Sequence, residues 1–269
     1  FLIAARHAHT EFISTLAQKT SVCVNHTDMH GANALHVAVQ EIETDSFYEP
    51  VAFSPCIDRL LQLKVSPLTQ DNAGNTPLVW AVQSLNIGAI RAILNTVDGK
   101  KSVNIANHMG NTPLHAYCWK HSHWKAGQGF YKSYSTDKIL LDALIDAGAD
   151  LQIKQHSHGY TPLHAMASSP LLVPITLLEA LIVSPTLDVN AQCTRNADTP
   201  LHLFAMNGHS TAVGVLMTKT SASMTIKNKF GQTPLQATVN QLIVEKIENF
   251  LEMEKNRSGD GSDTSGDGN

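Results

Sequence analysis

A four-residue element, Thr-Pro-Leu-His or a close variant, occurs six times along this chain of 269 residues and constrains its fold more than any other feature. Successive copies begin 43, 36, 49, 38 and 34 residues apart. A repeat of this length indicates one small unit that stacks on copies of itself, so the fold follows from the unit and not from total length. The copies are Asn33-Ala34-Leu35-His36, Thr76-Pro77-Leu78-Val79, Thr112-Pro113-Leu114-His115, Thr161-Pro162-Leu163-His164, Thr199-Pro200-Leu201-His202 and Thr233-Pro234-Leu235-Gln236.

The composition excludes several functional classes. Hydrophobic residues make up 43% of the chain, which suffices for a continuous core along such a stack. The formal net charge of −4 provides no general attraction to nucleic acid or to an anionic membrane. No apolar run approaches the roughly 20 residues of a membrane span, and the first residues lack the pattern of a signal peptide. The four cysteines form no C-x-x-C pair, so we expect free thiols in a reducing, cytoplasmic compartment.

Each copy of the element follows a turn and predicts the start of a helix. In Asp71-Asn72-Ala73-Gly74-Asn75, the aspartate begins the turn and the glycine supplies backbone freedom. Thr76 then stands where a helix N-cap belongs, and Pro77 occupies the first helical position, where its missing N–H has no cost. Small residues such as Ala165 allow two helices to pack closely, and a second apolar helix follows after a short turn.

This pattern resembles the ankyrin repeat over nearly the whole chain, residues 1–254. The marks in register are D-x-x-G-x-T-P-L-H, the Gly208-His209 pair between helices and Gly148-Ala149-Asp150 at a helix end. The resemblance implies an all-α solenoid of stacked antiparallel helix pairs with protruding β-turn fingers. The departures weaken local caps only: Val79 and Gln236 replace the histidine, Asn33-Ala34 replaces Thr-Pro, and Ala197 replaces the turn glycine.

The register predicts about seven units in residues 1–254, the first of them incomplete, with a last outer helix at 242–254. Residues 255–269 are rich in Gly, Ser and Asp and are expected to be disordered. Insertions near 41–54 and 120–136 separate the two helices of the second and fourth units, so both should emerge along one edge. They indicate either a binding face or tolerated loop growth.

The histidines and cysteines offer the main candidates for chemistry. The resemblance implies a structural role for four of the fourteen histidines, which bond the threonine and the neighbouring turn: His36, His115, His164 and His202. His-x-His pairs can share a zinc ion, but no carboxylate or thiolate has a suitable partner spacing. Cys118 follows His115 by three residues but lacks a group to orient that base, so we interpret it as a buried apolar residue. We therefore expect no metal, no cofactor and no catalysis.

The segment from Trp119 to Tyr134 interleaves aromatic rings with Lys120, Lys125 and Lys132 and contains no acid. Such a segment can bind single-stranded nucleic acid by stacking. It can equally form the hot spot of a protein interface, where Trp and Tyr are enriched. A third interpretation is that the rings fold the insertion back onto the solenoid. We expect no nucleic-acid partner.

The resemblance implies a non-catalytic scaffold, expected to be monomeric, that binds a protein partner through its concave face. The alternatives are a targeting module of a larger protein, an effector that an intracellular bacterium delivers into a host cytoplasm, or a His-rich metal-binding or catalytic protein. By the register of the family, the expected contact residues lie on turn tips and inner helices: His108, Met109, Asn111, Trp119, Lys120, His158, Tyr160, Arg195 and Phe230.

Overall fold

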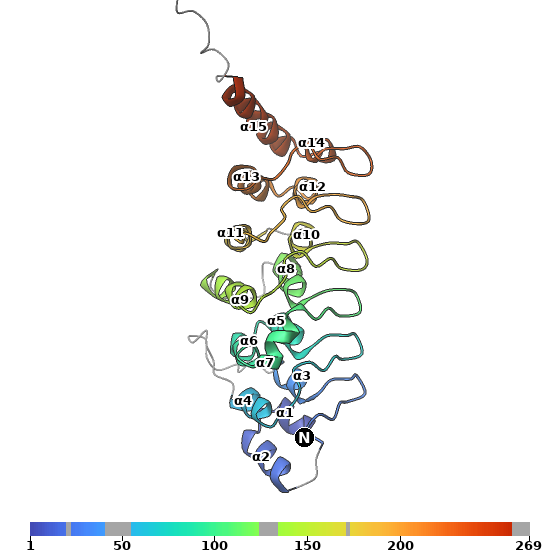
Figure 1. Ribbon diagram of the computed structural model, residues 1–269, viewed down its shortest axis with the longest axis vertical. Helices are drawn as coiled ribbons and strands as arrows, with labels where there is room; N and C mark the ends of the chain where they lie inside the picture. Colours follow the sequence, from blue (N-terminus) through green and yellow to red (C-terminus); the bar gives the residue numbers. More distant parts are fainter. Residues whose placement is uncertain (20–22, 41–54, 124–133, 171–172, 260–269) are drawn as a thin grey trace, which may run out of the picture.

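A computed structural model describes residues 1–19, 23–40, 55–123, 134–170 and 173–259, and within these ranges the regular structure is helical, with no strand. The helices form pairs that stack into an elongated solenoid with two rows of helices and a row of protruding turns on one side (Figure 1). We call the helices beside the turns the inner row and the others the outer row. The predicted all-α solenoid is confirmed.

Seven helix pairs, numbered as units 1 to 7, lie in the described residues. The inner row consists of α1 (Leu2–Arg6), α3 (Ala34–Ala38), α5 (Pro77–Ser84), α8 (Pro113–His123), α10 (Pro162–Ala167), α12 (Pro200–Met206) and α14 (Pro234–Ala237). The outer row consists of α2 (Thr10–Lys19), α4 (Pro55–Gln62), α6 (Ile87–Leu94), α9 (Tyr134–Asp146), α11 (Ile175–Ile182), α13 (Ser210–Lys219) and α15 (Gln241–Gly259). A short helix, α7 (Val97–Lys101), and a 3-10 turn, η1 (Ser102–Asn104), connect units 3 and 4.

The recurring element begins the inner helices as predicted. In α10 and α12 the N-cap is Thr161 or Thr199, and proline occupies the first turn. Both caps form a capping box in which the third helical residue is histidine. Asn33 performs the same function in α3, so the departure from Thr-Pro there leaves the cap intact.

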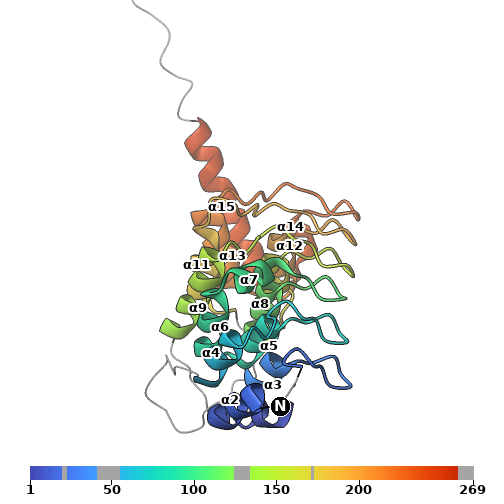
Figure 2. The ribbon, with the colours of Figure 1, turned by 60° about the horizontal axis from the view of Figure 1, so that its bottom comes forward.

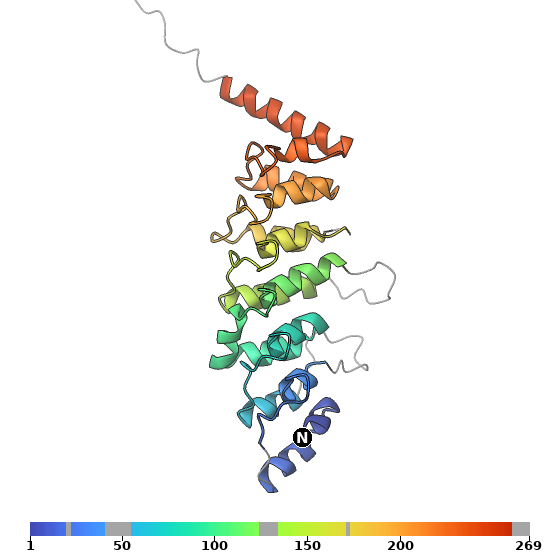
Figure 3. The same ribbon diagram turned by 90° about the vertical axis from the view of Figure 1, so that its right-hand side faces the viewer.

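The core runs between the two rows along the stack. The leucine of the element is at most 1% exposed in units 2 to 6, which makes it the most regular contributor to this core. Each inner helix packs on the inner helices of its neighbours, and each outer helix does the same in its row. Figure 3, turned to face the protruding turns, shows the units following one another along the axis.

The protruding turns, which we call fingers, occupy residues 28–32, 71–75, 107–111, 155–160, 193–198 and 228–232. They extend side by side from the inner row (Figure 2). A glycine with positive φ closes five of them, and Ala197, with φ of 57°, takes that place in the sixth-unit finger. Ala197 therefore adopts the left-handed conformation expected of the glycine that it replaces.

Some predicted boundaries differ from those observed. The insertion placed at 120–136 is shorter, because α8 continues to His123 and α9 begins at Tyr134. No Gly or Pro occurs between Trp119 and His123 to end the helix earlier. The outer helix predicted to end at Glu254 continues to Gly259. The other proposed insertion, 41–54, and residues 260–269 of the predicted tail lie outside the described residues.

Candidate functional site on the fingers and inner helices

Backbone hydrogen bonds connect each finger to the next. The N–H of Asn72 donates to the carbonyl of His30 at 2.8 Å, and the N–H of His108 donates to that of Ala73 at 3.0 Å. The same pattern continues to the last finger, in the pairs His156 to Met109 (2.9 Å), Thr194 to His158 (3.0 Å) and Lys229 to Asn196 (2.8 Å). The fingers therefore form a hydrogen-bonded ladder that holds their tips in fixed positions.

The histidines of the recurring element tie each unit to the next. His164 is fully buried; its Nδ1 accepts from the N–H of Thr161 at 3.3 Å, and its Nε2 lies 3.0 Å from the carbonyl oxygen of Asp198 in the next unit. Because a backbone N–H can only donate and a carbonyl can only accept, this arrangement requires neutral imidazole with its proton on Nε2. Three further histidines make the equivalent contacts, with Nε2 distances of 3.0 Å for His36, 2.9 Å for His115 and 3.0 Å for His202.

Burial lowers the pKa of these histidines, because it disfavours the charged form. For His164 it lowers the pKa to about 4, although the carbonyl of Asp198 opposes the shift. The predicted burial and backbone bonding of His115, His164 and His202 are confirmed.

Unit 3 lacks this link because Val79 stands where the histidine would be. Val79 is fully buried, and the hydroxyl oxygen of Thr76 beside it is the one buried side-chain oxygen or nitrogen in the described residues without a hydrogen-bond partner. The threonine hydroxyls of units 4 to 6 lie 2.8 to 2.9 Å from histidine Nδ1. The missing partner of Thr76 follows directly from the substitution at position 79.

Several predicted contact residues are open to solvent. Phe230 is 70% exposed, Met109 60% and Trp119 54%, and His108 and Arg195 are exposed as well. The remaining three described side chains are half-buried: Asn111, His158 and Tyr160. Lys120 lies in α8, and its side chain is outside the described part of the structure.

Tyr160 is packed between two histidines. Its ring stacks on that of His158 with centroids 5.0 Å apart and on that of His164 at 5.6 Å. Burial raises the pKa of the Tyr160 hydroxyl, and the nearby Arg195 opposes that shift. Arg195 Nη1 lies 2.6 Å from His158 Nε2. His158, Tyr160 and Arg195, predicted separately as contact residues, thus form one cluster across the fingers of units 5 and 6.

Trp119 lies beside this cluster and not within it. The His115 imidazole contacts the Tyr160 carbonyl at 2.9 Å, and Trp119 follows His115 by four residues, one turn along the same face of α8. One helical turn is about 5.4 Å of rise. Trp119 therefore stands one helical turn from the contact between α8 and the base of the next finger, and a patch shared by Trp119 and Tyr160 stays a prediction.

Comparisons with known proteins agree with this geometry. Residues 196–229 match the family model of the ankyrin repeat. A solved structure, the ankyrin repeat domain of Bcl-3, described as a unique member of the IkappaB protein family, superposes with a TM-score of 0.70 at 19% sequence identity. The match covers 92% of this chain and 96% of that one. The chain has the ankyrin-repeat fold. No curated protein matches its sequence.

The repeat register also places two further residues on this side, Met206 on an inner helix and Lys229 on a finger. Met206 is 40% exposed and follows the cap Thr199 by the same seven residues that separate Trp119 from Thr112. Lys229 donates from Nζ to the carbonyls of Thr194 at 2.6 Å and of Arg195 at 2.7 Å, so it holds the finger of unit 6. Register counting finds Met206, whereas the reach of Lys229 into the neighbouring finger is visible only in three dimensions.

The described residues of the ankyrin array offer little for catalysis or metal binding. They contain no group of three or more His, Cys, Asp or Glu side chains placed to hold a metal ion. Burial raises the pKa of the Cys118 thiol, and His115 is committed to Thr112 and Tyr160. Cys118 therefore lacks both the thiolate and the free base that a nucleophile needs. None of the helices in the described ranges is long and apolar enough to span a membrane.

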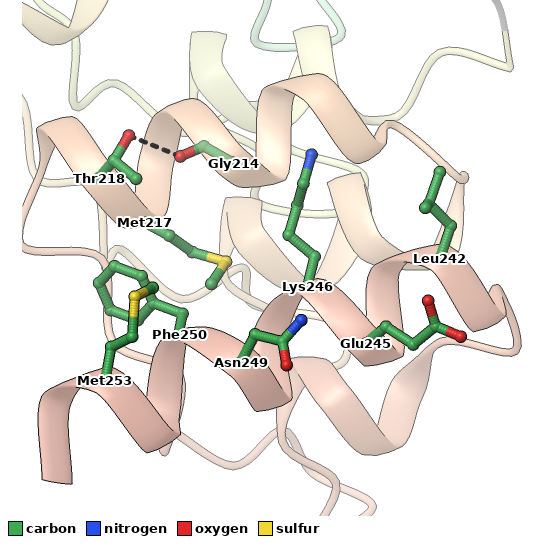
Figure 4. A pocket seen from close by; sticks show the side chains of 9 residues that line it. All are labelled: Gly214, Met217, Thr218, Leu242, Glu245, Lys246, Asn249, Phe250 and Met253. Atoms are coloured by element: carbon green, nitrogen blue, oxygen red, sulfur yellow. Dashed lines mark hydrogen bonds between the residues drawn. The ribbon is translucent and has the colours of Figure 1, made fainter. Parts of the chain in front are cut away.

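One groove lies on the outer row, away from the fingers. Met217, Phe250 and Met253 gather at one end of it, between α13 and α15 (Figure 4). Lys246 extends across α13, where its Nζ donates to the carbonyl of Ser210 at 3.0 Å. Gly214 makes room for this crossing, since a Cβ there would lie 3.3 Å from that nitrogen. The groove contains none of the residues predicted to bind a partner.

Proposed function

We propose that this chain is a non-catalytic module that binds a protein partner through the concave side of the array, formed by the fingers and the inner helices. The observation that carries the proposal is the exposure of large apolar side chains at repeated positions of this side. Trp119 and Met206 occupy the same register position of α8 and α12, and Met109 and Phe230 occupy equivalent finger tips. Aromatic residues and Met are enriched in interface cores, and Trp is a frequent hot spot.

Other exposed apolar residues are distributed differently. Ile3 and Phe12 belong to unit 1, while Val239, Leu242 and Met253 belong to unit 7. Val97 begins the connecting helix α7 and Val183 directly follows α11, and scattered surface apolar residues of this kind are normal. The exposed apolar residues of the fingers and inner helices, in contrast, recur at the spacing of the repeat. This arrangement suits a surface that binds one extended partner.

The finger ladder supports the same function energetically. Ordering loops on binding reduces affinity, and a surface that is already held avoids that loss. Backbone bonds from finger to finger and the contacts of Lys229 hold the tips before any partner arrives.

The module acts without chemistry of its own in this proposal, because Cys118 is a buried thiol and the histidines of the recurring element, His115 among them, are committed to packing. All four cysteines are free, which suits the proposed cytoplasmic location. A role as a targeting module or as a delivered effector would use the same surface.

Methionine footprinting tests which face binds. The full chain captures partners from a lysate, and each captured complex is treated with a mild oxidant before mass spectrometry. We expect protection of Met109 and Met206, with Met253 on the outer helix α15 still oxidised, since all three are at least 40% exposed in the free chain. Protection of Met253 with Met109 and Met206 unprotected would place the partner on the outer groove and contradict the proposal.

A further inference from the structure

The fingers carry their charges asymmetrically along the array. The finger segments 25–33, 66–76 and 104–112 contain two acids, Asp28 and Asp71, and no Lys or Arg. The segments 151–160, 189–199 and 222–233 contain one acid, Asp198, and four bases: Lys154, Arg195, Lys227 and Lys229. Two more acids, the exposed Asp150 and Asp188, come directly before the first two of these segments. All four bases are exposed, whereas Asp198 is 2% exposed. Four exposed bases against two exposed acids leave this part of the surface with a modest positive charge within a chain of net charge −4.

Arg195 is held in place with most of its guanidinium open. Its Nη1 donates to His158 Nε2 at 2.6 Å, and Ser157 Oγ lies 2.9 Å from the other ring nitrogen of His158. Within the described residues no acid pairs with Arg195, and its Nε and Nη2 atoms have no hydrogen-bond partner. A guanidinium fixed at one nitrogen presents the others to a planar acceptor such as a carboxylate.

Lys229 places a second charge against the same finger. Its ammonium contacts the backbone carbonyl of Arg195 at 2.7 Å, and within the described residues it forms no ion pair. Asp198, the acid within these fingers, is buried and accepts from Asn228 Nδ2 at 2.9 Å, and within the described residues it forms no ion pair with Arg195 or Lys229. Phe230, next to Lys229 and 70% exposed, adds an apolar contact at the rim of the charged area.

We propose that the fingers of units 5 to 7 bind an acidic segment of the protein partner, with Arg195 as the main carboxylate contact. The inference rests on the proposed function and adds the chemistry of the partner to it. Lys229, Lys227 and Lys154 supply a surrounding positive field that steers such a segment to the fingers. Phe230 contacts an apolar side chain between the acids.

Carboxylates fit this surface better than nucleic acid does. Single-stranded nucleic acid is held by bases that stack on open aromatic faces. The half-buried ring of Tyr160 already stacks on His158 and on His164, which leaves Phe230 as the exposed ring of this site.

Fluorescence anisotropy with the full chain tests the inference. The probe is a fluorescein-labelled peptide that alternates Glu with Leu and Gly, and the matched peptide has Gln in place of every Glu. An oligouridine of equal charge is the third probe. The variant Arg195→Gln is compared with Arg195→Lys and with the double variant Lys100→Gln and Lys138→Gln, whose exposed lysines lie on α7 and α9 away from the fingers.

The proposal requires binding of the acidic peptide that weakens with salt and exceeds binding of the Gln peptide. Arg195→Gln should weaken it about tenfold, which is about 1.4 kcal/mol. The affinity of Arg195→Lys for the acidic peptide should lie between those of Arg195→Gln and the parent chain. The double variant in α7 and α9 should bind the peptide as tightly as the parent. Three results would overturn the proposal. They are equal affinity for the Glu and Gln peptides, an equal loss of affinity in Arg195→Gln and in the α7/α9 variant, and tighter binding of oligouridine than of the acidic peptide. Matching melting temperatures confirm that each variant is folded.

The two proposals can fail separately. If captured partners protect Met109 and Met206 but the acidic peptide does not bind, the protein-binding function stands and the acidic chemistry is wrong. If the peptide binds in an Arg195-dependent manner but captured partners protect Met253 instead, the charged fingers are a site separate from the main interface.

Discussion

His164 Nε2 donates to the carbonyl of Asp198 in the following unit at 3.0 Å while its Nδ1 accepts from the N–H of Thr161. One side chain therefore caps its own helix and joins it to the next unit. In a stack where each unit contacts only its neighbours, such joints contribute directly to cooperativity.

Replacing His164 with Ala should lower the free energy of unfolding by about 1–3 kcal/mol, because the buried Asp198 carbonyl and Thr161 N–H lose their partner. Chemical denaturation provides the measurement. His30→Ala is the matched control, since His30 is exposed at a finger tip and its side chain makes no hydrogen bond in the described structure. Equal stability of His164→Ala and the parent would show that the joint is not structural.

Acid should destabilise the array between about pH 6.5 and 4. Burial lowers the pKa of His36, His115, His164, His202 and His209 in the folded chain, to about 4 for His164. An unfolded histidine titrates near 6.5, so below that pH the unfolded state binds more protons. The stabilisation is therefore fully present above about pH 6.5 and is lost as the pH falls through the folded pKa.

His164→Gln tests this dependence at one position. The chain already uses Gln236 in place of the histidine, where its Oε1 accepts from the N–H of Thr233 at 3.0 Å. The variant should keep that type of bond and lack the titration, so the difference in stability between pH 7 and pH 4 should shrink by on the order of 2–3 kcal/mol. An unchanged pH dependence would assign the acid sensitivity to other groups.

Thr76 and Thr161 should respond oppositely to the same substitution. Thr76→Val removes a buried hydroxyl that has no partner, so stability should stay within about 0.5 kcal/mol of the parent or rise. Thr161→Val removes a capping contact to His164 and should cost about 1–2 kcal/mol. Thermal melting of the two variants is the measurement. An equal loss of stability in both would contradict the conclusion that Val79 leaves the Thr76 hydroxyl without a partner.

Gly110 and Ala197 form a second contrasting pair. A Cβ on Gly110 would lie 2.6 Å from the backbone nitrogen of His156 in the next finger, and its φ of 81° already disfavours a side chain. Gly110→Ala should destabilise the array by about 1–2 kcal/mol or more. Ala197→Gly should instead stabilise it by up to about 1 kcal/mol, because it relieves the left-handed strain at φ of 57°.

Particular residues show how much of this structure could be predicted from the register of the repeat. It predicted the helix starts, the four histidine joints and the weak cap at Val79, because these depend on local spacing. It was wrong about the caps at Asn33 and Gln236, where a capping box forms in spite of the departures from the repeat. It missed the stacking of Tyr160 on His158 and on His164, which depends on side-chain orientation and not on the period. It also missed the contacts of Lys229, because they depend on how closely two fingers approach and not on the period.

The affinity of a captured partner for a paired set of variants tests the central claim most directly. Trp119→Ala with Met206→Ala should weaken binding by roughly thirtyfold or more, since a truncated anchor typically costs about 2 kcal/mol. The comparison variant, Val97→Ala with Val183→Ala, changes exposed residues of α7 and of the end of the outer helix α11. This outer variant should leave affinity unchanged, and both variants should melt near the parent. Unchanged affinity in a folded Trp119/Met206 variant, or an equal loss in the outer variant, would contradict partner binding by the fingers and inner helices.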